Sequence, residues 1–133
     1  MKSRDALIRL KRFDVEEKRR KVAEIENMIG DFNHMAIDLD RQIAIEQERA
    51  GVSDVNHYAY PTFAKAAIQR RDNLAISAEN LAAKLAAARD DLNEACEELK
   101  KIELLEERDA ERLRHEQGRA SELEEVGIHR VAS

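Results

Sequence analysis

The fold is decided by residues 8–50, IRLKRFDVEEKRRKVAEIENMIGDFNHMAIDLDRQIAIEQERA, in which one apolar position recurs every seven residues. The companion position, three residues later, is apolar in the middle of the segment, at Ile25, Phe32 and Leu39. Two apolar stripes with this spacing predict a helix that packs against another helix along a narrow seam. The members of the first stripe are Ile8, Val15, Val22, Ile29, Ala36, Ile43 and Ala50.

We expect this first helix to cover about residues 3–50, because Gly51 suits the left-handed conformation that ends many helices. Residues 51–61, GVSDVNHYAYP, lack the pattern of seven and form the predicted tip. Pro61 keeps Tyr60 out of the helical conformation and suits the first turn of a second helix.

The period of seven returns in a second predicted helix, which covers about residues 62–115 or beyond. The pattern weakens after Ile102, and Gly118 costs a helix about 1 kcal/mol relative to Ala. We therefore expect helical order to fade after about residue 115. Residues 110–133 are a predicted overhang past the partner helix, as a lone helix or as a frayed terminus.

The short tip makes the two helices antiparallel neighbours. If the numbers of facing residues add to about 110, large side chains meet small ones, as Phe32 meets Ala78 and Val22 meets Ala88. The expected fold class is therefore all-α, with residues 1–133 forming one long two-helix antiparallel coiled-coil hairpin.

The charges agree with this arrangement. Residues 1–21 contain nine Lys and Arg against four Asp and Glu, whereas residues 90–125 contain six Lys and Arg against fourteen Asp and Glu. The antiparallel register lays the basic segment along the acidic one and opposes a parallel arrangement.

The composition argues against catalysis. Charged residues make up 38% of the chain and aromatic residues 4%, which is typical of coiled coils. Two helices offer no concave site for acid–base chemistry, and Cys96 is interpreted as a small apolar filler beside the seam rather than a reactive thiol. The sequence therefore predicts no enzyme and no cofactor. It also predicts no metal site, because the histidines are too dispersed to converge: His34, His57, His115 and His129.

Two other partner classes are also not expected. The basic cluster at residues 18–21, KRRK, follows Glu16 and Glu17 and has no interleaved aromatic residue, so we interpret it as a solvated face rather than a nucleic-acid site. The chain has no apolar segment resembling a signal peptide or a membrane span, and we expect a soluble, cytoplasmic protein.

The tip has the composition of a protein-binding surface. Both tyrosines and one of three phenylalanines fall within residues 58–63, and further apolar residues lie outside the two stripes nearby. Such a patch marks a partner site, the alternative being a small cluster that caps the turn. The candidate tip residues are Ile37, Ile45, Tyr58, Tyr60, Phe63 and Ile68.

Three segments together resemble the FliJ family of flagellar export proteins, and most of all its alphaproteobacterial branch. They are MKSRDALIRLKRFDVEEKRRKVAEIE (1–26), HYAYPTFAKAAIQRRDNL (57–74) and EELKKIELLEERDAER (97–112). The resemblance implies a non-enzymatic, stalk-like coiled coil of the flagellar type III export apparatus. Such a protein is cytoplasmic and is recruited to the cytoplasmic face of the inner membrane at the flagellar base.

The resemblance also implies the partners, which are the hexameric export ATPase, the cytoplasmic domain of the export gate, and export chaperones. The tip would contact the gate, and the two chain termini would sit in the ATPase ring. By analogy of position, the candidate ring-facing residues are Arg9, Arg12, Arg108, Arg112 and Arg114.

Two other functions stay open. A stalk protein of a virulence type III secretion system would have the same fold and different partners. A coiled-coil holdase chaperone or a structural spacer belongs to another class, and predicts obligate oligomers and apolar tips that bind unfolded proteins.

Overall fold

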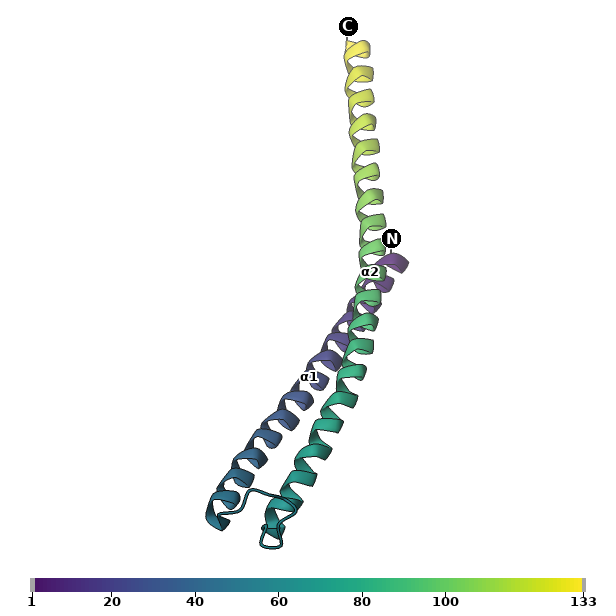
Figure 1. The fold of residues 1–133 in the computed structure, drawn as a ribbon. Coiled ribbons are helices and arrows are strands. Elements are labelled where there is room, and N and C mark those ends of the chain that lie inside the picture. Colours follow the sequence, from purple (N-terminus) through teal and green to yellow (C-terminus); the bar gives the residue numbers. More distant parts are fainter. Residues whose placement is uncertain (1, 133) are drawn as a thin grey trace. The chain divides into compact units, whose positions relative to one another are not determined.

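The computed structural model describes residues 2–132 and contains two helices, α1 (Lys2–Ala50) and α2 (Thr62–Ala132). The helices are joined by one loop and pack against each other in antiparallel directions (Figure 1). This confirms the predicted all-α helical hairpin. Side chains are described for residues 3–127, so the side chain of His129 lies outside the described part.

The chain divides into two compact units, both of which contain a part of each helix. The tip unit is Glu17–Leu92 and includes the loop. The stem unit consists of Met1–Glu16 and Asn93–Ser133. Of the described residues, none lies in a helix long and apolar enough to cross a membrane.

The tip unit is held by two apolar clusters on the seam. In the first, Val22 and Ile25 of α1 pack with Leu81 and Ala88 of α2. In the second, nearer the loop, Leu39 and Ile43 pack with Ala67. The buried positions recur at the predicted spacing of seven because only the stripe that faces the partner helix is removed from water. Partly buried side chains extend both clusters: Ile29, Phe32, Leu85, Leu92, Ile68 and Leu74.

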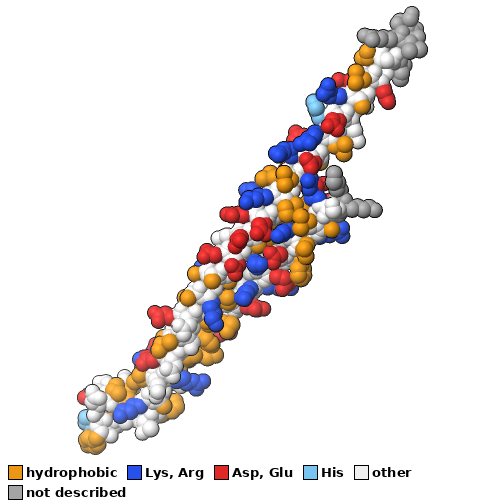
Figure 2. Space-filling view, turned by 90° about the vertical axis from the view of Figure 1, so that its right-hand side faces the viewer, with side chains coloured by type: hydrophobic (Ala, Val, Ile, Leu, Met, Phe, Trp, Pro, Cys, Tyr) orange, Lys and Arg blue, Asp and Glu red, His pale blue; other side chains and the backbone are white. Residues whose placement is uncertain are grey.

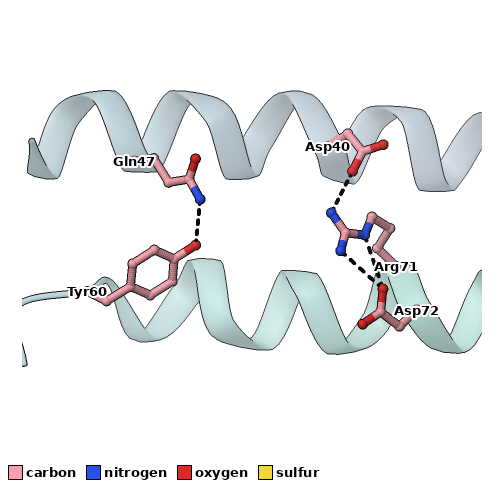
Figure 3. Close-up of polar contacts among 5 residues, drawn as sticks. All are labelled: Asp40, Gln47, Tyr60, Arg71 and Asp72. Carbon is pink, nitrogen blue, oxygen red and sulfur yellow. Dashed lines mark hydrogen bonds and ion pairs between the residues drawn. The ribbon is translucent and has the colours of Figure 1, made fainter. Parts of the chain in front are cut away.

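An ion pair between the helices agrees with the predicted register of the tip unit. Arg71 occupies an apolar-stripe position of α2, and its Nη1 donates a hydrogen bond of 2.9 Å to Asp40 Oδ1 of α1 (Figure 3). Its Nη2 also donates to Asp72, at 3.1 Å. These bonds raise the pKa of Arg71, the one with Asp40 most strongly. The numbers of Asp40 and Arg71 add to about 110, as the sequence predicts.

In the stem unit, too, the numbers of facing residues add to about 110. Ile8 and Val15 of α1 and Ala95 of α2 are buried. Lys11 Nζ donates a hydrogen bond of 2.8 Å to Glu98 Oε2, and the two residue numbers again add to about 110. The predicted meeting of basic α1 with acidic α2 is thus confirmed within this unit.

The C-terminal end of α1 agrees with the sequence prediction, whereas the C-terminal end of α2 differs from it. Gly51 has a φ of 68° and its N–H donates to the carbonyl of Glu48 at 3.3 Å, which ends α1 as predicted. In contrast, the expected fading of order after about residue 115 is not found, because α2 is helical to Ala132. No proline interrupts this segment, and its two glycines, Gly118 and Gly127, weaken the helix without breaking it.

Candidate partner-binding surfaces

The loop of the tip unit is shaped by local hydrogen bonds. Asp54 accepts two of them, one at its side chain from the N–H of Asn56 at 3.0 Å and one at its carbonyl from the N–H of His57 at 3.1 Å. His57 Nδ1 then accepts from the N–H of Ala59 at 3.0 Å. Short polar side chains that satisfy nearby backbone groups are what fold such turns. The loop therefore has a defined path and presents its next side chain, Tyr58, outward.

Tyr58 is the most exposed large apolar side chain of the candidate set, at 96%. Its ring stacks on His57, with centroids 4.6 Å apart. A rigid aromatic ring that has almost no contact with its own fold is well suited to fill a pocket on another protein. Val55, which the sequence analysis did not single out, is 40% exposed on the same loop.

Tyr60 differs from the expectation that it is part of an exposed patch. Its side chain is buried, at 6% exposure, and its hydroxyl accepts a hydrogen bond of 2.9 Å from Gln47 Nε2 (Figure 3). The reason is its position, because Tyr60 precedes the buried Ala67 by seven residues and belongs to the seam. The period of seven was therefore a signal that could have identified it.

The other four candidates of the tip unit are divided between exposure and packing. Ile37 and Ile45 are 48% and 50% exposed on α1, and Phe63 is 56% exposed in the first turn of α2. Ile68 is only partly exposed, because it packs against the cluster of Leu39, Ile43 and Ala67. We call Ile37, Ile45, Val55, Tyr58 and Phe63 the tip surface. The unit has further exposed apolar side chains at Met28, Met35 and Ile76.

The five candidate arginines all belong to the stem unit. Arg12 lies 3.5 Å from Glu103 of α2, and Arg112 lies 3.9 Å from Asp109 on its own helix. Arg9, Arg108 and Arg114 are exposed. The arginines therefore lie on a surface of mixed charge, and two of them are partly neutralised by carboxylates.

Arg4 makes the most extensive ion pair of the stem unit, and the sequence analysis did not single it out. Its guanidinium donates hydrogen bonds to Asp109 and, at 3.4 Å, to Glu106. The bond from Arg4 holds the pKa of the Asp109 carboxyl below its ordinary value. Arg4 precedes Lys11 by seven residues, so it continues the second stripe of α1 as a basic position facing an acidic helix.

Apolar side chains are also exposed beside these charges. Leu104 and Leu105 line a groove on α2 together with Lys101 and Arg108. On α1, the exposed apolar residues of the stem unit are Leu7, Leu10 and Phe13. Figure 2 shows hydrophobic side chains interspersed among acidic and basic ones on the face that it presents.

The remaining candidates for chemistry have ordinary surroundings. Within the described residues, no group of three His, Cys, Asp or Glu side chains could hold a metal ion. Cys96 is a free, partly buried thiol next to the seam residue Ala95. In comparisons with protein-family models, with curated proteins and with solved structures, no significant match to this chain is found.

Proposed function

We propose that this chain is a non-enzymatic stalk of a bacterial type III protein export apparatus, most simply the flagellar one. In this role the tip surface binds the cytoplasmic domain of the export gate, and the stem unit binds the ring of the hexameric export ATPase. Export chaperones are further partners. The protein reaches the cytoplasmic face of the inner membrane at the flagellar base through these contacts.

The observation that carries the proposal is the exposed aromatic tip. Tyr58 is 96% and Phe63 56% exposed, and both lie in residues 57–74, one of the three segments that resemble the FliJ family. The neighbouring Tyr60 is buried, so this part of the fold covers one aromatic ring and leaves the other two exposed. Two aromatic rings left in water close to an ordered turn favour a binding surface over a cap for the turn.

The stem unit supports the second half of the proposal. Its two helices carry the five candidate arginines and an exposed apolar groove at Leu104 and Leu105. Arginine beside apolar surface is the composition expected where a partner protein docks, because its planar guanidinium binds carboxylates while its stem packs.

Binding of the gate domain tests the tip assignment. Replacing Phe63 by Ala is expected to weaken binding of the chain to the purified cytoplasmic gate domain by about tenfold or more, since a buried aromatic anchor contributes at least about 1–2 kcal/mol. Isothermal titration calorimetry measures the effect. Circular dichroism checks that the helix content is unchanged.

Ile76 provides a matched control. It is 55% exposed on the same helix and in the same unit as Phe63, but it lies thirteen residues further along α2. Ile76→Ala is expected to bind the gate domain as the wild type does. Equal losses for the two variants, or no loss for either, would contradict the tip assignment.

A holdase chaperone is the second candidate function. The exposed large apolar residues of both units, which include Leu10 and Phe13, would suit the capture of unfolded chains. Suppression of the aggregation of a heat-denatured client protein, without binding to the ATPase or the gate domain, would favour this candidate.

A further inference from the structure

Residues 110–127, the last part of α2 whose side chains are described, bury none of these side chains against α1. Every side chain in this segment is exposed, including Leu113 at 55% and Leu123 at 71%. The stripe that forms the seam nevertheless continues into it, because Leu113, Ala120 and Leu123 keep the spacing of a coiled coil from Leu99 and Ile102 onward. A single helix of this length is marginal in water, so its apolar stripe gains stability when another helix covers it.

The charges of this segment change sign along its length. Residues 110–119 carry three arginines (Arg112, Arg114 and Arg119) against two glutamates, whereas residues 120–127 carry three glutamates and no Lys or Arg. A helix with a small net positive charge at one end and a larger net negative charge at the other complements a copy of itself when the copy runs in the opposite direction.

We propose that residues 110–127 pair with the same segment of a second copy of this chain, as an antiparallel two-helix coiled coil. The register follows from the stripe: Leu113 faces Leu123 of the second copy, and facing residue numbers add to about 236. Arg112 then lies on the same side as Glu122 of the other copy, and Arg114 on the same side as Glu124. The twofold axis repeats each of these contacts.

Glu116 decides between the antiparallel and the parallel pairing. It occupies a stripe position, so a parallel pair would place it directly against Glu116 of the other copy. In the antiparallel register it faces Ala120 and lies close to Arg119 of the other copy. Like charges within a seam are destabilising, and this selects the antiparallel pair.

This pairing goes beyond the proposed stalk function, because it concerns the chain before any partner binds. A dimer formed in this way covers Leu113 and Leu123 and leaves the tip surface free. The interface is short, so we expect a weak, concentration-dependent dimer rather than an obligate one.

Sedimentation equilibrium of the whole 133-residue chain tests the proposal. The wild type is expected to show a reversible equilibrium between monomer and dimer. The double variants Arg112→Glu/Arg114→Glu and Glu122→Arg/Glu124→Arg are each expected to dimerise at least about tenfold more weakly, because four attractive charge contacts become repulsive. A mixture of the two variants is expected to form a heterodimer, since the reversed charges again match.

Cross-linking distinguishes the orientation. In a Cys96→Ala background, Gln117→Cys lies next to the twofold axis and is expected to link to itself across the dimer with a short bis-maleimide. Glu125→Cys is the control, because its two copies would lie roughly 20 Å apart along the antiparallel pair. A wild-type monomer at every concentration, failure of the charge-reversed mixture to associate, or equal linking at both positions would overturn the proposal.

Discussion

The variant Tyr60→Ala is expected to lose about 3 kcal/mol of the free energy of unfolding. The Tyr60 ring is 6% exposed and closes the seam at the base of the loop, next to the fully buried Ala64. Replacing a buried aromatic side chain with alanine removes its apolar contacts and leaves a cavity that the neighbours fill only in part. Urea denaturation followed by circular dichroism measures the loss.

Two further variants separate the parts of this effect. Tyr60→Phe retains the ring and loses only the hydrogen bond from Gln47, so it should cost about 1 kcal/mol. Tyr58→Ala removes a ring that is 96% exposed and should leave stability unchanged. If Tyr58→Ala destabilised the chain as much as Tyr60→Ala, the assignment of one ring to the seam and the other to the surface would be wrong.

Replacing Ile43 by Ala is expected to destabilise the chain by about 2–3 kcal/mol. Ile43 is 5% exposed and packs with Leu39 and Ala67 in the cluster nearer the loop. The residue opposite is already small, so no side chain can move in to fill the space that Ile43 leaves. The midpoint of thermal unfolding should fall accordingly.

The chain supplies a control for Ile43 two residues away. Ile45 is the same residue type on the same helix, but it is 50% exposed and belongs to the tip surface. Ile45→Ala should therefore change the unfolding midpoint very little. A similar loss in both variants would show that α1 does not bury the face that the period of seven predicts.

Much of the fold could be predicted from the period of seven alone. A stripe that repeats without a polar residue from Ile8 to Ala50 leaves one face of α1 to bury, and the short loop makes α2 the nearest helix to bury it. The alternation of large and small residues then favours the observed register, in which Val22 and Ile25 pack with Leu81 and Ala88.

The candidate surfaces were less predictable, because composition does not distinguish the two sides of a loop. Tyr58 and Tyr60 are two residues apart, yet one is exposed and the other buried. Their difference depends on a turn built from Asp54 and His57, whose hydrogen bonds direct the chain back to the seam. The stripe spacing from Ala67 identifies Tyr60 only once the seam is known to extend past Pro61.

The stem unit shows a similar limit. Arg4 lies on the second stripe of α1, where the apolar pattern is lost, so the period of seven did not identify it as a contact residue. Its contacts with Glu106 and Asp109 become evident only when the two helices are aligned. The helical continuation of α2 beyond residue 115 was one of two alternatives that the sequence left open, because the apolar stripe weakens after Ile102 and a lone helix is marginal in water.

The claim central to this protein is that one chain joins two partners at different parts of its fold. Size-exclusion chromatography with light scattering, applied to a mixture of the chain, the hexameric export ATPase and the cytoplasmic gate domain, tests it most directly. We predict a complex of all three proteins, which does not form when the chain is left out. With the Phe63→Ala variant, we expect the gate domain to be lost from this complex while the ATPase stays bound. If the ATPase and the gate domain never co-elute with the chain, or if each displaces the other from it, the chain is not a stalk that joins them.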